Sequence, residues 1–340
     1  MSKIILVTGG AGYVGSALIQ TLLKKRYKIR VLDRLVFTES SLQDIKDKIE
    51  LVKEDIRDVK ENVMKNVFAV IHLAGFATEP TAQYSPRLTD FINHIATERL
   101  AKMAKKAGVR RFIFSSSCSV YFTYDTPLTP PLYKETDKIN PISPYSLSKH
   151  AAEEALLEIN DRNFPVIIFR KGTIYGLSPR MRYDLVVNSF VKDAFLNQHL
   201  SVNSGGMIFR PLVDIQDVVW AYVQALEMPL NKIRGKIFNV SSQNWNIGYL
   251  AKVVKKILEK EKNLQIKIDI QPLGLTRNYQ ADNTLFKKTF QFKPRRTLKK
   301  AILEIFSHLE KNKDKNFLNP IFYNDLWYTQ KLKNGELNNL

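Results

Sequence analysis

The chain has 340 residues, the length of about two domains of ~150 residues each. It is 44% hydrophobic and 25% charged, with 14 glycines and 14 prolines, which excludes a disordered, collagen-like or low-complexity chain. The 52 basic and 33 acidic residues give a net charge of +19, which would suit nucleic acid, an anionic membrane surface or a phosphorylated ligand.

The positive charge is dispersed along the chain. It falls in stretches such as KKRYK and VVKKILEKEK, and no RNA-binding signature or zinc-ligand spacing accompanies it. We therefore interpret these lysines as solvated helix faces and expect no nucleic-acid partner. No apolar run approaches the roughly 18 residues of a membrane span, so we expect no membrane partner. The five histidines have no partner at ligand spacing, so we expect no metal.

Two features of the sequence bear on cellular location. The single cysteine, Cys118, excludes an intramolecular disulfide and suits a reducing compartment. The first residues, MSKIILVTGG, lead into a glycine-rich motif without the apolar segment and cleavage site of a signal peptide. We expect a cytoplasmic protein.

The first half of the chain alternates predicted strands with predicted helices. Buried apolar strands in such an alternation favour an α/β fold with a doubly wound parallel sheet, the Rossmann fold. The strands are predicted over 3–8, 28–32, 49–52, 68–73, 111–115 and 166–169, and the helices over 13–25, 86–107 and 144–160.

The pattern changes after residue 176, where an irregular basic stretch begins. We predict a dinucleotide-binding domain over 1–176, to which 214–248 returns. A smaller C-terminal substrate-binding domain is expected over 177–213 and 249–340. The packing of 311–340 cannot be predicted. Helices are predicted over 184–195, 217–227 and 247–260, and a strand over 236–240.

A glycine-rich turn joins the first predicted strand to the first helix. Glycines there permit a tight turn and a close approach of the backbone to a pyrophosphate, beside the positive end of the helix. The candidate cofactor contacts in this motif, TGGAGYVG, are Gly9, Gly12, Tyr13, Val14 and Gly15.

Polar and small residues at three further strand ends complete the predicted dinucleotide site. Asp33 closes the second strand, where a carboxylate can bind the adenosine ribose and repel a 2′-phosphate, so we predict NAD rather than NADP. Neighbouring Arg34 weakens this preference because arginine pairs with phosphate. The other candidates are Asp55 and Ile56 beside the adenine, and Leu73, Ala74 and Gly75, whose small size admits the cofactor.

A serine, a tyrosine and a lysine form the candidate catalytic centre. Ser117 follows the fifth predicted strand, and Tyr145 and Lys149 lie four residues apart on one face of the next helix. A nearby ammonium favours the phenolate and lowers the pKa of a tyrosine. Tyr145 could then remove a proton from a sugar hydroxyl that Ser117 orients, while hydride leaves the same carbon for nicotinamide.

With these motifs, the chain resembles the extended short-chain dehydrogenase/reductases that act on nucleotide sugars, of the UDP-glucose 4-epimerase type. The resemblance covers about residues 3–300 and rests on TGGAGYVG, HLAG, FSSSCSVY, PYSLSK, RPLVDIQD and RNYQAD. It implies the catalytic roles of Ser117, Tyr145 and Lys149, and a second contact of Lys149 and Tyr145 with the cofactor. It also implies a homodimer through helices 86–107 and 144–160.

The resemblance implies a nucleoside-diphosphate sugar as substrate. Asn188, Arg210 and Arg277 match diphosphate contacts of the family, and guanidinium suits phosphate because its planar donors bind two oxygens. Ser117 and Cys118 are the candidate contacts to the sugar. Arg180 and Arg182 are vaguer candidates for a lid.

The reaction itself is left open by the sequence. The related dehydratases carry an Asp-Glu pair where Cys118 and Ser119 stand here, so dehydration and decarboxylation are disfavoured. The simplest reaction is 4-epimerisation, and a net 4-dehydrogenase or 4-ketoreductase would need the same residues. A non-catalytic dinucleotide-binding regulatory protein is the remaining alternative, against which the intact Ser117, Tyr145 and Lys149 argue.

Overall fold

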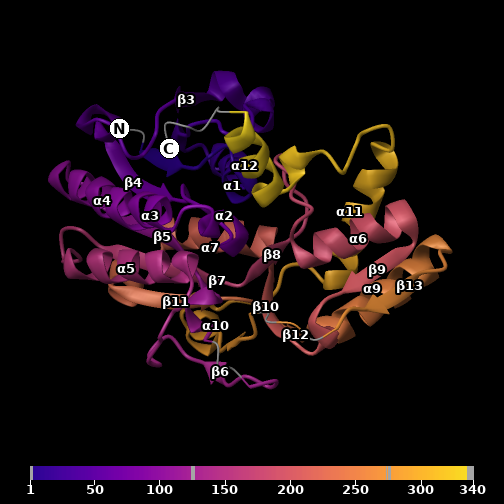
Figure 1. The fold of residues 1–340 in the computed structure, drawn as a ribbon. Coiled ribbons are helices and arrows are strands. Elements are labelled where there is room, and N and C mark those ends of the chain that lie inside the picture. Colours follow the sequence, from indigo (N-terminus) through magenta and orange to yellow (C-terminus); the bar gives the residue numbers. More distant parts are fainter. Residues whose placement is uncertain (1–2, 124–126, 273, 275–276, 335–340) are drawn as a thin grey trace.

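A seven-stranded parallel sheet lies at the centre of the computed structural model, which describes residues 3–123, 127–272, 274 and 277–334 (Figure 1). The strand order is β11-β7-β5-β4-β1-β2-β3, and every neighbouring pair is parallel. This confirms the predicted doubly wound fold. The strands are β1 (Ile4–Thr8), β2 (Lys28–Leu32), β3 (Ile49–Val52), β4 (Val67–His72), β5 (Phe112–Ser117), β7 (Val166–Lys171) and β11 (Lys236–Val240).

Helices cover both faces of this sheet, as the apolar strands require. Alternate residues of β1 enter opposite cores: Ile5 and Val7 pack with α1 (Tyr13–Lys24) and α7 (Ile215–Glu227), and Leu6 packs with α4 (Ala96–Lys106) and α5 (Pro144–Glu158). The loops and edges on these faces carry α2 (Glu79–Gln83), α3 (Pro86–Asp90), a π-helical turn (Phe91–Ile95), α8 (Leu230–Ile233) and α10 (Thr284–Phe290).

The second half of the chain also forms smaller sheets beside the main one. One has the order β12-β10-β8, and two further pairs are β13-β9 and β14-β6. Among the described residues, β11 of segment 214–248 joins the main sheet, whereas β12 of the same segment pairs with β10. The predicted domain boundaries remain a prediction. These strands are β6 (Leu132–Tyr133), β8 (Thr173–Tyr175), β9 (His199–Val202), β10 (Phe209–Asp214), β12 (Gln243–Asn246), β13 (Lys267–Ile270) and β14 (Gln280–Ala281).

Three helices of this second half pack on one another: α6 (Val186–Asn197), α9 (Ile247–Lys262) and α11 (Leu298–Lys311). The chain then returns through α12 (Asn324–Lys333), which contacts α2 beside the main sheet (Figure 1). Among the described helices, none is long and apolar enough to cross a membrane.

Some of the observed element boundaries differ from the predicted ones because tertiary contacts determine where these elements end. β5 and β7 extend two residues beyond their predicted ends, to Ser117 and Lys171, because the two strands pair there. The helix α5 begins where expected, because the Ser143 and Ser146 side chains each bond the backbone N–H of the other. The helix predicted over 86–107 is divided by the π-helical turn.

A buried ion pair ties α5 to the sheet. Both carboxylate oxygens of Glu153 on α5 accept hydrogen bonds from Arg170 on β7, with the Arg170 Nη2 at 2.6 Å. The hydroxyl of Ser116 on β5 donates to the same carboxylate. Arg170 also donates to the Tyr121 hydroxyl at 3.0 Å. The two charged side chains are almost fully buried, so each charge depends on the other to compensate for its lost hydration.

Glu153→Ala should therefore destabilise the protein strongly, because it leaves the Arg170 guanidinium buried without its carboxylate. The expected loss in the free energy of unfolding is about 3–5 kcal/mol, measured by urea denaturation. Glu61→Ala is the matched control, since its ion pair with Lys106 is exposed and worth about 1 kcal/mol or less. Equal losses in the two variants would contradict the role given to Glu153.

Candidate functional site

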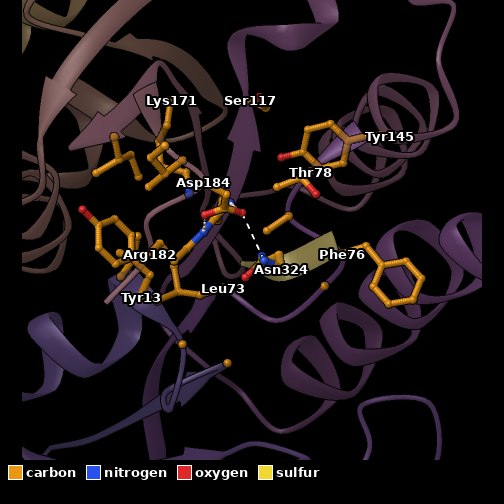
Figure 2. Close-up of a pocket in the computed structure, with 18 of the residues that line it drawn as sticks. Tyr13, Leu73, Phe76, Thr78, Ser117, Tyr145, Lys171, Arg182, Asp184 and Asn324 are labelled. Atoms are coloured by element: carbon orange, nitrogen blue, oxygen red, sulfur yellow. Dashed lines mark hydrogen bonds and ion pairs between the residues drawn. The ribbon is translucent and has the colours of Figure 1, made fainter. Parts of the chain in front are cut away.

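One cavity of about 630 Å³ lies at the carboxyl ends of the parallel strands (Figure 2). Gly9 after β1, Ser117 at the end of β5 and Lys171 at the end of β7 all line it. This is where open α/β sheets bind ligands, and the volume suits a cofactor and a small substrate group. Every predicted cofactor contact lines this cavity: Gly9, Gly12, Tyr13, Val14, Gly15, Asp33, Arg34, Asp55, Ile56, Leu73, Ala74, Gly75, Tyr145 and Lys149.

The glycine-rich turn has the geometry that a dinucleotide needs. Gly9 has a φ of +68°, and a Cβ there would lie 2.7 Å from the Ala74 backbone nitrogen, so a larger residue would close the turn. Gly12 caps α1, and it has no side chain to hydrogen-bond the first N–H groups of the helix. The N-terminus of α1 is thus available to an anion, and the residues fit the pyrophosphate of NAD.

The adenosine end of the cavity carries two anchored acids. The carboxylate of Asp33 accepts hydrogen bonds from the backbone N–H of Ala11 at 2.9 Å and of Leu35 at 2.7 Å. Burial raises the pKa of Asp33, and these two hydrogen bonds oppose the rise. Asp55 holds Arg34 at 3.2 Å, so the arginine that could weaken the preference for NAD is already paired.

The structure brings Ser117, Tyr145 and Lys149 to the same cavity. Figure 2 shows the Tyr145 ring with its hydroxyl turned toward the middle of the cavity. The Nζ of Lys149 lies 4.9 Å from the centre of the Phe114 ring and 6.0 Å from that of the Tyr145 ring. α5 supplies the tyrosine and lysine and β5 the serine, as the spacing predicted.

The expected lowering of the tyrosine pKa by Lys149 is not found. Burial raises the pKa of Tyr145, and a hydrogen bond with Ser117 only partly offsets this. Burial also lowers the pKa of Lys149 to about 8, so the same enclosure that brings the two groups together disfavours charge on both.

The structure places two of the expected substrate contacts behind the cavity wall. The Cys118 thiol is fully buried, donates to the Arg170 carbonyl at 3.2 Å and does not line the cavity. Asn188 is also fully buried; its amide oxygen accepts from Gly176 N at 3.0 Å and its amide nitrogen donates to the Tyr13 hydroxyl at 3.1 Å. Both side chains therefore support the walls of the site.

The expected diphosphate arginines do line the cavity together. Arg210 on β10 stacks over the Tyr279 ring at 4.9 Å, and its charge faces that of Arg277. Burial lowers the pKa of Arg210 to about 10, and the nearby Arg277 adds to this. Two neighbouring cations in a buried cleft suit a dianionic group.

Sequence reasoning missed Lys171 and left Arg182 vague. Arg182 forms a two-pronged ion pair with Asp184, with contacts of 2.9 and 2.7 Å (Figure 2). Lys171 lies near Arg182 on the side of the cavity opposite Tyr145 (Figure 2). Lys171 escaped notice because the strand was predicted to end at residue 169. Its position directly after a buried strand was the available signal.

The C-terminal helix α12 also contributes to the cavity. Asn324 accepts a hydrogen bond from Arg180 at 2.6 Å, and its backbone N–H donates to Asp184 at 3.1 Å. Tyr328 packs edge-on against Phe76, with ring centres 5.1 Å apart. The segment assigned to the substrate region thus lies over the cofactor end of the site. No motif in the sequence of α12 predicts its contact with the cavity.

The chain belongs to the NAD dependent epimerase/dehydratase family, whose model matches residues 5–241. A protein of Methanocaldococcus jannaschii, provisionally named a UDP-glucose 4-epimerase, is 31% identical over 74% of this chain and 81% of its own length. UDP-arabinose 4-epimerase 1 of Arabidopsis thaliana is 27% identical over 88% of this chain and 77% of its own.

The fold is shared with solved members of this class. UDP-glucuronic acid 4-epimerase of Bacillus cereus, solved with UDP-glucuronic acid and NAD, superposes with a TM-score of 0.78, at 23% identity over 91% of this chain and 99% of its own. UDP-glucose 4-epimerase of Thermotoga maritima gives a TM-score of 0.78 at 24% identity, with the same coverage. The resemblance to the extended short-chain dehydrogenase/reductases is confirmed, as are an enzyme of this type and NAD as its cofactor.

Asp33→Asn should reduce the preference for NAD over NADP. The change keeps a hydrogen-bond acceptor but removes the negative charge that repels a 2′-phosphate, so the ratio of the two dissociation constants should fall by about tenfold or more. Titration calorimetry with each dinucleotide measures it. Asp58→Asn, an exposed site outside the cavity, is the control. Tighter binding of NADP to the unaltered protein would show that Asp33 does not select the cofactor.

Proposed function

We propose that the protein is a nucleotide-sugar 4-epimerase. The observation that carries this is the convergence of Ser117, Tyr145 and Lys149 on one side of a cavity whose other residues suit NAD and a diphosphate. The 4-epimerases among the relatives support the same reaction. Cys118 faces away from the cavity, so acid–base chemistry at a second sugar carbon, as in a dehydratase, has no residue there to perform it.

In this proposal Tyr145 accepts the proton of the C4 hydroxyl of the sugar, and Ser117 holds that hydroxyl by a hydrogen bond. NAD, held by the glycine-rich turn and the strand ends, would supply the acceptor and donor of the C4 hydride. Arg182 lowers the pKa of Tyr145 against the effect of burial and is the cation that favours the phenolate. Lys149, whose Nζ lies 6.0 Å from the centre of the Tyr145 ring, would contact the cofactor. The 4-ketosugar then turns in the cavity so that the opposite face of C4 is presented for hydride return, and Tyr145 gives its proton back to the C4 oxygen.

Arg210 and Arg277 would bind the diphosphate and keep it fixed while the sugar turns. Neither has an ion pair with a described carboxylate, so both charges are available to phosphate oxygens. A net 4-dehydrogenase would use the same groups. The enclosure of the cofactor end by α12 favours the epimerase, because hydride is then returned without exchange of cofactor.

The test is conversion of UDP-sugars to their 4-epimers by the purified protein with NAD, followed by NMR. Tyr145→Phe keeps the ring and removes the hydroxyl that moves the proton, so turnover should fall about 10²–10⁴-fold while NAD binding persists. Tyr183→Phe is a matched control, because its hydroxyl has no hydrogen bond among the described atoms and it does not line the cavity. Near-full activity of Tyr145→Phe would place the acid–base group elsewhere.

We also propose a homodimer through the helices predicted for it. The π-helical turn before α4 exposes 45% of Phe91 and 39% of Ile95, and α5 exposes 49% of Leu147. These apolar side chains lie on two elements that pack against each other, and exposed apolar side chains are typical of interaction surfaces. α3 and α5 are in contact in the same way.

Light scattering should give twice the mass of one chain. Combining Phe91→Glu with Leu147→Glu should yield a monomer, because charge is costly in a buried apolar interface. Tyr249→Glu, at an aromatic on α9 that is more exposed than Phe91, should leave the mass unchanged. A monomeric unaltered protein at micromolar concentration would contradict the proposal.

A further inference from the structure

Lys171 is a cation in the cavity for which the proposed reaction has no use. It is the last residue of β7 and pairs in register with Ser117 of β5, so both side chains leave the same face of the sheet. Lys171, Ser117 and Tyr145 line the same cavity, and Figure 2 shows Lys171 on the side toward which the Tyr145 hydroxyl points.

The charge of Lys171 is not balanced by the protein. Its ammonium has no hydrogen bond or ion pair with any residue of 3–123, 127–272, 274 or 277–334. The charged groups that face it are Lys149 from α5 and Arg182 from the loop after β8, with the Cys118 thiol behind. Asp184, the carboxylate of this wall, is taken by Arg182 and by the backbone N–H of Asn324.

An unpaired ammonium among other cations is unfavourable until an anion joins it. Burial, Lys149 and Arg182 together lower the pKa of Lys171 to about 7. A neutral sugar would offer no anionic partner for the Lys171 ammonium at this position. The arrangement therefore points to a negatively charged group on the ligand.

The position of Lys171 indicates that the negatively charged group it binds is not the diphosphate. Arg210 on β10 and Arg277 already provide two neighbouring cations for phosphate. Lys171 instead lies beside Ser117, where the sugar ring must be for Tyr145 to reach its C4 hydroxyl. An anionic group within reach of a sugar C4 is a carboxylate on the adjacent C5.

We infer that Lys171 binds a carboxylate on the sugar, so that the substrates are nucleoside-diphosphate uronic acids; this rests on the proposed 4-epimerase function. Lys171 is then a specificity-determining residue. It pairs with the carboxylate of a correctly seated uronic acid and leaves a neutral sugar without a partner for its charge. The carboxylate must stay near Lys171 in both epimers.

The test compares kcat/KM for UDP-glucuronic acid and for UDP-glucose in the unaltered enzyme, Lys171→Met and Lys171→Gln. The unaltered enzyme should favour UDP-glucuronic acid. Each variant should lose roughly 100-fold on UDP-glucuronic acid, the effect of removing one partner of a buried ion pair, and change little on UDP-glucose. Arg210→Leu is the control, since loss of a diphosphate contact should lower kcat/KM for both substrates by the same factor.

The pH dependence gives a second readout. Lys171 is protonated below about pH 7 and loses its charge above it. The ratio of the two kcat/KM values should therefore be highest below pH 7 and fall as the pH rises through it. In Lys171→Met the ratio should be low and independent of pH in this range. Taking the ratio cancels the ionisations of Tyr145 and Lys149, which both substrates share.

Three outcomes would overturn the inference. They are a preference of the unaltered enzyme for UDP-glucose, an equal loss on both substrates in Lys171→Met, and a ratio that does not change with pH. If both variants fail to fold, the substrate preference and its pH dependence in the unaltered enzyme still decide. Conversion of UDP-glucose without conversion of UDP-glucuronic acid refutes this inference alone, whereas no conversion of any nucleotide sugar refutes the proposed function.

Discussion

The buried ion pair between Glu153 and Arg170 sets the geometry of the whole site. It joins the middle of α5 to β7, and the hydroxyl of Ser116 adds β5 to the same carboxylate. Lys149 lies about one turn and Tyr145 about two turns before Glu153 on the same helix, so the ion pair fixes the position of both side chains relative to the strand ends. A buried charge pair tolerates little displacement, because moving either partner exposes an unsolvated charge to the core.

The site that results has charges of opposite sign at its two ends. Asp33 and Asp55 lie at the end where α1 begins, and they suit the hydroxyls and base of an adenosine. Arg210, Arg277 and Lys171 lie toward the second half of the chain, where phosphate and carboxylate would be bound. In the proposed reaction this polarity would orient a dinucleotide and a nucleotide sugar so that their reactive carbons meet beside Tyr145. Part of the net charge of +19 therefore lies in the cavity, where it would bind anionic groups of the ligand, and the rest lies on solvated helix faces.

Local patterns in the sequence predicted the parts of the site that local geometry determines. The glycine turn requires Gly9 in a left-handed conformation close to Ala74, so its composition identifies it without tertiary information. The face shared by Tyr145 and Lys149 follows from helical spacing. Cys118 and Asn188 could not be placed in this way. A position near the site does not say whether a side chain enters the cavity or bonds a neighbour, as Cys118 does with Arg170 and Asn188 with Tyr13.

The remaining errors arise from tertiary contacts and burial. β7 continues to Lys171 only because β5 and β11 pair with it there, which apolar pattern alone does not reveal. α12 has no strong amphipathic pattern and is held by single contacts such as Trp327 to the Val36 carbonyl at 2.8 Å. The pKa of Tyr145 was expected to fall because Lys149 is near, but burial raises it, and burial can be judged only in the fold.

The central claim is that hydride leaves C4 of the sugar and returns to the same carbon within one closed site. A UDP-sugar carrying deuterium at C4 tests this most directly, with the product analysed by NMR and mass spectrometry. The account predicts that the 4-epimer keeps its deuterium and that no reduced cofactor accumulates during turnover. Transfer of the deuterium to one equivalent of reduced cofactor per sugar, with a ketosugar as product, would contradict it and identify a net dehydrogenase.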